Sequence, residues 1–164
     1  MLNFDLVMHE GEFRKIKDEL KKLYELSNAK VLFLVDKNGQ LIDSVGDTHD
    51  IDTTALASLT AGNIAATGGI AQLLGEREFT ILFHEGEKDN IHISLIGQRI
   101  ILAVIFDQKS SLGLVRLRVK RATERLTRIF EDIAKKSEEA GEDANPDASS
   151  LAELTDEDID RLFG

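Results

Sequence analysis

Twenty-three consecutive residues, Thr53 to Gly75, include no charged side chain. We expect them to form a helix that Asp52, Thr53 or Thr54 caps and that Gly75 ends. A helix on the surface of a monomer usually presents charged residues to water. A membrane span is a poor alternative, because only six of the 23 residues are Leu or Ile and polar residues are scattered among them. We therefore expect one side of this helix to pack on the chain's own sheet and the other to meet a second protein molecule.

Three glycines, Gly62, Gly68 and Gly69, lie inside this expected helix. Each costs roughly 1 kcal/mol of helix stability relative to alanine, so their presence needs a reason. Small residues let two helix backbones approach closely, which favours a two-fold homodimer with this helix near the axis. The alternative is a helix that packs only within its own fold.

Hydrophobic periodicity organises the rest of the chain. Apolar spacings of three and four predict an amphipathic helix over residues 9–27 whose buried face is Phe13, Ile16, Leu20, Leu23 and Tyr24. Strands are expected at 31–35, 41–45, 79–84, 90–95 and 99–106, and a last helix after Ser110-Ser111. Asn38-Gly39 is a strong hairpin signal, because both residues tolerate positive φ. The order α-β-β-α-β-β-β-α predicts an α+β fold, a three-layer sandwich whose five-stranded antiparallel sheet has two helices on one face and one on the other.

The formal net charge is −10, and nearly all of it belongs to the C-terminal tail. Residues 1–137 carry 20 acidic and 19 basic residues, whereas residues 138–164 carry ten acidic residues and Arg161 as their one base. We expect one folded domain over 1–137, an acidic flexible linker over 138–150 and a short docking helix over 151–164. An acidic chain of this kind is a poor ligand for nucleic acid or for an anionic membrane.

The last residues have the pattern of a short capped helix. Thr155 is placed to cap it, while Leu154 and Ile159 hold the two positions of a hydrophobic staple. Ile159, Leu162 and Phe163 then fall on one face. About eight residues do not form a stable helix alone, so we expect Leu154, Ile159, Leu162 and Phe163 to dock on a partner. The alternative is a disordered tail that only keeps the protein soluble.

The sequence offers no recognisable catalytic, cofactor or metal site. It has no phosphate-binding Gly-x-x-x-x-Gly-Lys-Ser/Thr motif and no cysteine for thiolate chemistry. His84 and His92 could approach each other on a hairpin, but a third metal ligand is not evident. The N-terminal residues lack the basic and apolar segments of a secretory signal. We therefore expect a cytoplasmic protein that is not an enzyme.

Several segments carry a resemblance to a known family. They are VLFLVDKNGQLI at 31–42, DIDTTALASLTAGN at 50–63, SLTAGNIAATGGIAQLLG at 58–75, FHEG at 83–86 and VIFDQKSSLGLVRLR at 104–118. Over roughly residues 5–137 the chain resembles the roadblock (dynein light chain) superfamily, and within it the bacterial gliding-motility regulators. The resemblance implies a homodimer in which the second strands and the second helices associate.

The same resemblance implies a function. Such regulators are cytoplasmic activators of a small Ras-like GTPase of the MglA type in the control of cell polarity and motility, so a cell pole is one expected location. Two regulator chains embrace one GTPase in its GTP-bound state. They lend no catalytic group and no cofactor, and they act by reshaping the switch region of the GTPase.

Small and polar residues of the second helix are the candidates for contact with the GTPase. Ala65 and Gly69 lead, because they are four apart on one helical face. The full candidate set is Ala61, Ala65, Gly68, Gly69 and Gln72. The candidate dimer contacts are Leu59, Gly62, Ala66, Leu73, Phe79 and Ile81.

Basic residues crowd the last helix. Arg118, Arg121, Arg125 and Arg128 lie about opposite its apolar stripe, so a solvated helix face is the first interpretation. An electrostatic docking strip is the second, and its residues would be Lys15, Lys120, Arg121, Arg125 and Arg128. An arginine finger, which can raise a GTPase rate by about 10³–10⁵, is the last.

Three function classes remain after this reasoning. A GTPase-activating regulator is favoured, and a non-catalytic dimeric scaffold of a polarity complex is the alternative. A small-ligand sensor is the weakest, because a sensor does not need an uncharged second helix.

Overall fold

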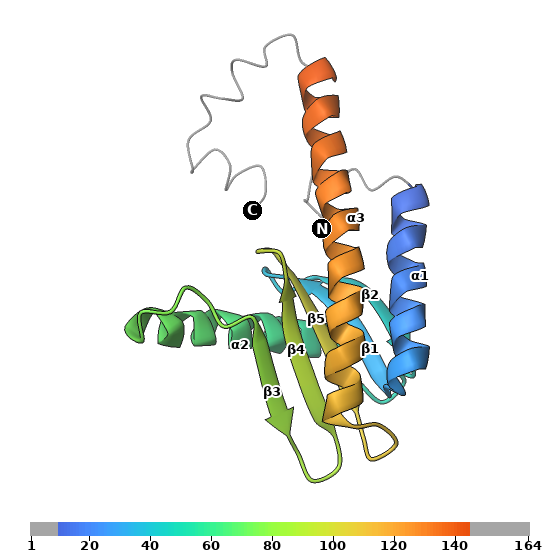
Figure 1. The fold of residues 1–164 in the computed structure, drawn as a ribbon, viewed down its shortest axis with the longest axis vertical. Coiled ribbons are helices and arrows are strands. Elements are labelled where there is room, and N and C mark those ends of the chain that lie inside the picture. The colour runs from blue at the N-terminus through green and yellow to red at the C-terminus, as the bar shows by residue number, and fades with distance from the viewer. Residues whose placement is uncertain (1–9, 145–164) are drawn as a thin grey trace.

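The computed structural model of the chain describes residues 10–144. Three helices and five strands follow one another in the predicted order (Figure 1). They are α1 (Glu10–Ser27), β1 (Val31–Asp36), β2 (Leu41–Gly46), α2 (Thr53–Leu73), β3 (Ile81–Glu85), β4 (Asn90–Ile96), β5 (Ile100–Phe106) and α3 (Leu112–Ala144).

The strands form one antiparallel sheet in the order β2-β1-β5-β4-β3. β1 and β5 lie in the middle of it, and every residue of both strands is buried. Apart from Asp36 at the end of β1, both strands are continuous apolar runs, as expected of strands that are covered on both faces and need no alternation of apolar and polar residues. β2 and β3 are the two edges.

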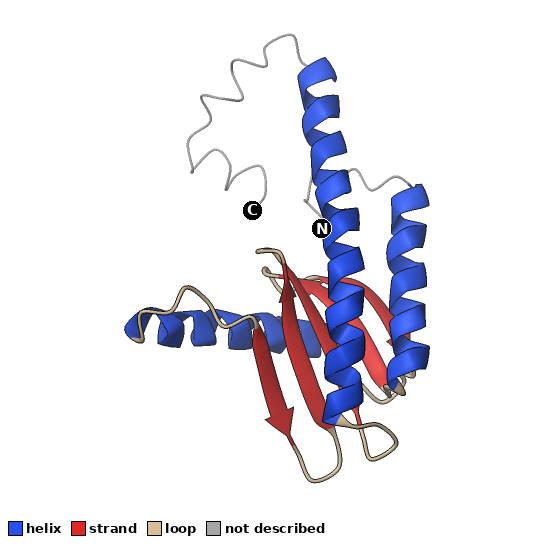
Figure 2. Ribbon diagram, in the orientation of Figure 1, coloured by secondary structure: helices blue, strands red, loops and turns tan. Residues whose placement is uncertain are grey.

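Helices cover both faces of the sheet (Figures 1 and 2). α1 and α3 lie side by side on one face, where Ile16, Leu102 and Leu126 are part of one buried apolar cluster. α2 lies across the other face, where Ala57 and Ile64 belong to a second buried cluster. The predicted three-layer α+β sandwich, with two helices on one face and one on the other, is confirmed.

The turn between β1 and β2 differs in type from the expected one. Gly39 has a φ of 88°, whereas Asn38 keeps a negative φ. The carbonyl oxygen of Asp36 accepts the Gly39 N–H at 3.0 Å, and its carboxylate accepts the N–H groups of Asn38 and Gln40, each at 2.9 Å. The register of the two strands shifts next to the turn. The hairpin is therefore closed by a type I turn with a glycine bulge, and only the glycine needs the left-handed region.

Two predicted boundaries are corrected. β3 begins at Ile81 rather than at residue 79, because Thr80 contributes only one bond to the sheet, from the Leu95 N–H to its carbonyl oxygen at 2.9 Å. α3 continues to Ala144, past the domain end expected near Ser137. Residues 138–144, which we expected in a flexible linker, are therefore helical.

The first turn of α1 also differs from the prediction. Phe13, expected on the buried face, is 39% exposed. Glu12 takes the buried position instead, and its carboxylate accepts a hydrogen bond from Lys136 Nζ of α3 at 2.7 Å. An ion pair, rather than an aromatic contact, therefore joins the start of α1 to α3.

A histidine is buried beneath α3. His92 on β4 is 1% exposed, and neither ring nitrogen has a hydrogen-bond partner. Its cross-strand neighbours are Phe83 and Val104. Burial lowers the pKa of His92 from its ordinary value of 6.5, and the positive charge of Arg116 lowers it further. The imidazole is therefore neutral in the folded protein at pH 7.

Acidification should destabilise the fold through His92. The unfolded chain binds the proton near pH 6.5, whereas the folded chain binds it only at lower pH, so the free energy of unfolding falls as the pH drops from about 7 to about 5. Each unit of difference between the two pKa values contributes about 1.4 kcal/mol. Urea denaturation at both pH values measures the loss. The variant His92→Leu should lose less over the same interval, and an equal loss in both proteins would contradict the assignment to His92.

Candidate protein-binding surface

The uncharged helix α2 has a side-chain cap, and its inner threonines bond to the helix itself. Asp52 is the N-cap, and its carboxylate accepts the Ala55 N–H at 3.0 Å. The hydroxyl of Thr60 donates to the Leu56 carbonyl oxygen at 2.7 Å, and that of Thr67 donates back along the helix in the same way. The hydroxyls of Thr60 and Thr67 therefore do not require contact with water or with a charged partner.

The end of α2 has the predicted stop. Gly75 has a φ of 74°, which glycine adopts without strain. Its N–H donates to the Gln72 carbonyl oxygen, and the Glu76 N–H donates to that of Ala71 at 2.9 Å. The pattern is a Schellman motif, which turns the chain back toward β3.

One side of α2 packs on the sheet, and the other side exposes large apolar residues. Ala57, Thr60 and Ile64 are among the buried residues. Leu59 is 72% and Leu73 is 87% exposed, and Ile70 and Leu74 are also exposed. Large contiguous apolar surfaces are rare on monomeric proteins and usually mark an interaction site.

The interior glycines of α2 have no packing role within the chain. A Cβ added at Gly62, Gly68 or Gly69 would meet no atom within 4 Å. Packing inside the fold therefore does not explain why a helix tolerates three residues that each cost roughly 1 kcal/mol relative to alanine. A close contact outside the chain does explain it.

Exposed apolar residues also lie on the edge strand β3, but on the face of the sheet that α1 and α3 cover, because Phe83 pairs with His92 and Ile81 with Ser94. Ile81 is 50% and Phe83 is 37% exposed, and no strand among the described residues pairs with the outer edge of β3. Asn63 of α2 and His84 of β3 are hydrogen-bonded at 2.9 Å, which joins the two elements. We use the name α2–β3 surface for the exposed apolar residues of α2 together with those that lie around the β3 edge on the other face of the sheet: Leu59, Ile70, Leu73, Leu74, Ile81 and Phe83.

The second edge strand, β2, is different. Its residues are buried or half-buried apart from Gly46, and the ion pair of Lys17 with Asp43 at 2.8 Å ties α1 to it. Within residues 10–144, β2 contributes no exposed large apolar side chain. The edge strand with exposed apolar side chains is therefore β3. The family resemblance implied that the second strand, β2, associates in the dimer.

The residues predicted to contact the GTPase differ in exposure. Ala65, Gly69 and Gln72 are exposed, and Gly68 is half-buried. Ala61 is 8% exposed and packs in the core beneath α2, so its place in this set was wrong. A helical position facing the sheet is covered by the sheet, which the sequence alone did not indicate.

Most predicted dimer residues are accessible. Leu59, Gly62, Ala66, Leu73 and Ile81 are exposed, and Phe79 is half-buried. The prediction missed Ile70 and Leu74, which are exposed on α2, and Phe83, which is exposed at the β3 edge on the other face of the sheet. The absence of charged residues around Ile70 and Leu74 could have indicated that they are contact residues. The exposure of Phe83 could not be predicted from the sequence, because it depends on the position of β3 at the edge of the sheet.

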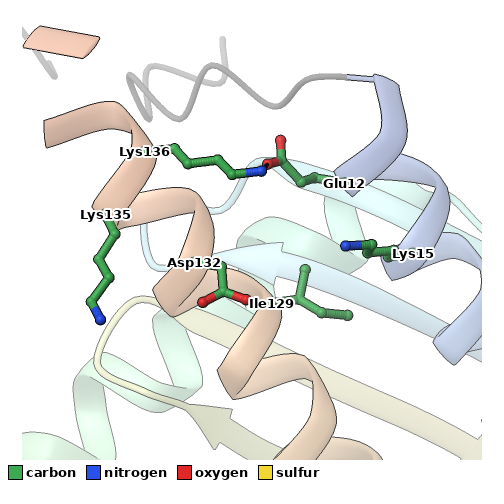
Figure 3. Close-up of a pocket in the computed structure, with 6 residues that line it drawn as sticks. All are labelled: Glu12, Lys15, Ile129, Asp132, Lys135 and Lys136. Carbon is green, nitrogen blue, oxygen red and sulfur yellow. Dashed lines mark hydrogen bonds and ion pairs between the residues drawn. The ribbon is translucent and has the colours of Figure 1, made fainter. Parts of the chain in front are cut away.

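The arginines of α3 lie on the opposite face of the sheet from α2. They line a groove between α1 and α3, together with Lys15, Glu19 and Ile129. We call it the α1–α3 groove, and Figure 3 shows its end near the start of α1, where Lys136 reaches across to Glu12. Its arginines are Arg118, Arg121, Arg125 and Arg128.

Two details of the predicted basic strip change. The arginines lie beside the apolar stripe of α3 rather than opposite it, because each directly precedes a residue of that stripe and is about 100° from it around the helix. α1 packs along that flank. Lys120 is exposed but is not among the residues that line the groove. The strip therefore retains Lys15, Arg121, Arg125 and Arg128. The predicted tail contacts Leu154, Ile159, Leu162 and Phe163 lie outside the described residues.

The two hairpin histidines do not face each other. His84 pairs with Ile91 and His92 with Phe83, so their side chains lie on opposite faces of the sheet. Over residues 10–144 no group of three His, Cys, Asp or Glu side chains is placed to hold a metal ion. No helix in that range is long and apolar enough to cross a membrane.

Comparison with known proteins identifies relatives of this fold. The family model of the Roadblock/LC7 domain matches residues 15–106, a region that includes both α2 and β3. The solved structure of Myxococcus xanthus MglB is 59% identical with a TM-score of 0.74, and the match covers 77% of this chain and 96% of that chain. Comparison with curated protein sequences gave no match.

Two further MglB structures are similar. The gliding protein MglB from Thermus thermophilus is 31% identical with a TM-score of 0.72. An MglB with a tetrameric arrangement is 30% identical with a TM-score of 0.73. Each match covers 77% of this chain and 96% of the other.

We expect the α2–β3 surface to join two copies of the chain. Light scattering should give a mass near twice the 18.2 kDa of one chain. Leu73→Lys with Ile81→Lys should produce a monomer, because each lysine would place a charge in an apolar contact that cannot solvate it.

The matched control lies on α3. Leu117 is an exposed leucine outside the α2–β3 surface, so Leu117→Lys should leave the mass unchanged. A monomeric wild-type protein at micromolar concentration, or a dimer that survives both lysines, would contradict this interface.

Proposed function

The chain belongs to the Roadblock/LC7 domain family, and from that membership we propose that it is a homodimeric regulator of a small Ras-like GTPase of the MglA type. It acts in the cytoplasm, with a cell pole as one site of action, in the control of polarity and motility. It raises the rate of GTP hydrolysis without supplying a catalytic residue.

The combination of high identity and an uncharged, outward-facing α2 supports this proposal. The match to Myxococcus xanthus MglB extends over 77% of the chain at 59% identity, and a more distant match is named a gliding protein. A Cβ added at Gly62, Gly68 or Gly69 of α2 would meet no atom within 4 Å in one chain. The observation that carries the proposal is therefore a small-residue surface without a partner in its own chain, in a chain related to MglB.

We place the dimer contact on the α2–β3 surface. Unpaired N–H and C=O groups on an edge strand favour pairing with another strand, and a two-fold axis would bring two copies of β3 together in antiparallel register. This contact would also bring the two α2 helices near one axis and cover Leu59 and Leu73. In this proposal the strands that pair across the dimer are the two copies of β3, whereas the family resemblance implied the second strands.

The GTPase binds one flank of α2. Ala65, Gly69 and Gln72 are exposed and carry no charge, so they leave room for the backbone of a partner to approach closely. In a dimer the two flanks would form one composite surface. That geometry accounts for two regulator chains acting on one GTPase.

The mechanism uses binding energy and not an arginine finger. The arginines of the α1–α3 groove and the α2 flank lie on opposite faces of the sheet, so a GTPase held at α2 is remote from them. A regulator that binds the reactive conformer of the switch region more tightly makes that conformer more populated. The barrier falls because catalytic groups of the GTPase itself are held in place.

Ala65→Arg with Gly69→Arg should abolish GTPase stimulation and leave a folded dimer. Each arginine would place a long charged side chain in a close contact that cannot solvate it. Single-turnover GTP hydrolysis by an MglA-like GTPase, with and without the variant, measures the effect.

The matched control carries the same two substitutions on the other side of the sheet. Ala134 and Gly113 are exposed on α3, and a Cβ at Gly113 meets nothing within 4 Å. Ala134→Arg with Gly113→Arg should therefore retain full stimulation. Full stimulation by the α2 variant would show that the GTPase docks elsewhere. Binding of the GTPase by the wild-type protein with no gain in rate would instead support a dimeric scaffold.

Arg77 tests the mechanism directly. It is exposed on the loop that connects α2 to β3, so among the described arginines it is the one closest in sequence to the α2 flank. We expect Arg77→Ala to change the stimulated rate by less than about ten-fold, since loss of a true arginine finger costs about 10³–10⁵. A loss in that range, with the GTPase still bound, would make Arg77 the finger and overturn this mechanism.

A further inference from the structure

We propose that the C-terminal segment, residues 151–164, docks in the α1–α3 groove of its own chain. The argument uses the charge, the apolar residues and the position of the groove, and it does not depend on the GTPase proposal. It assigns an occupant to the one strongly basic groove among the described residues.

The groove has more positive charge than its own residues neutralise. Eight basic and four acidic residues line it along its length. Arg125 approaches Glu19 only to 3.6 Å, and Nε of Arg118 is buried without a hydrogen-bond partner. The C-terminal segment has the opposite balance, five acidic residues and one arginine. Its carboxylates would supply the partners that the groove arginines lack.

Apolar contacts would fix the pose of the segment. Ile129 lines the groove, and Leu26 lines its other end and is 40% exposed. The sequence pattern predicts a helix that presents Ile159, Leu162 and Phe163 on one face. Acidic residues next to that face would then lie over the basic residues that line the groove before and after Ile129, Arg125 and Lys135 among them.

The chain is long enough to make this contact. The described part of α3 ends at Ala144, far beyond the sheet (Figure 1). Ile129 lies about 22 Å back along the helix axis, at about 1.5 Å per residue. Residues 145–153 span about 30 Å when extended, at about 3.3 Å per residue. The segment can therefore fold back along α3 without strain.

The other large surface does not suit this segment. The α2–β3 surface is apolar and α2 has no charged residue, so it offers no partner for the five carboxylates. Docking in the α1–α3 groove also leaves α2 free. The segment would thus occupy the groove in the free protein, and any acidic partner of the groove would have to displace it.

Paramagnetic NMR on the full-length protein tests the proposal. The chain has no cysteine, so Asp18→Cys introduces a unique spin label at the groove and Ser58→Cys a control label on α2. If the docked state is the more populated one, the segment lies near the groove label most of the time. The amide signals of residues 155–163 should then lose roughly two-fold or more of their intensity with the groove label. They should lose little intensity with the control label on α2. In about 1 M salt the loss should largely disappear, because the Debye length falls to about 3 Å.

Charge reversal supplies a matched control. Arg125→Glu with Arg128→Glu should release the segment and restore its signals. Arg77→Glu with Arg99→Glu changes the net charge equally at two exposed arginines outside the groove, and it should leave the loss unchanged. Circular dichroism establishes that each variant is folded.

Three outcomes would overturn the proposal. One is a segment whose signals are unaffected by the groove label or are affected equally by both labels. The second is a loss that survives reversal of Arg125 and Arg128 in a folded variant. The third is broadening seen only between copies, in mixtures of a spin-labelled chain with an isotope-labelled one, because this would place the segment on the partner chain.

Discussion

The burial of β1 and β5 on both faces is the constraint on which the rest of the structure depends. Neither strand has alternating polar residues, so an uncovered face would expose a continuous row of Val, Ile, Leu and Phe to water. Helices must therefore cover the sheet on both sides. The two faces are covered by different numbers of helices, α1 and α3 on one face and α2 alone on the other. The two faces differ in chemistry as a result.

The face covered by α2 alone is incomplete in one chain. A single helix cannot cover five strands, and β3 remains an unpaired edge, with Ile81 and Phe83 exposed on its other face. α2 itself is apolar toward the sheet and uncharged toward solvent, and a Cβ at its interior glycines would meet no other atom within 4 Å. Each of these features has a cost for an isolated monomer, and one association between two copies would offset all of them. This is the physical basis of the proposed dimer.

The face covered by α1 and α3 has the opposite character. Two amphipathic helices pack on that core and leave their charged flanks around a basic groove. The sheet separates this groove from the α2 surface, so two partners of different chemistry can bind without touching each other. An uncharged partner surface belongs to α2, and an acidic segment belongs to the groove. The strong acidity of residues 138–164 gives the chain itself such a segment.

The sequence by itself determined the element order, the fold class, the cap and stop of α2 and the family, because these depend on local periodicity, capping residues and long shared segments. Only the tertiary structure decided which edge is open and which side of α2 is covered. Ala61 and Ala65 are both alanines of one uncharged helix, yet the sheet buries the first and leaves the second exposed. Likewise, the arginines of α3 form a groove only because α1 packs beside them. Such positions depend on contacts between residues far apart in the chain, and the pattern along one segment does not contain them.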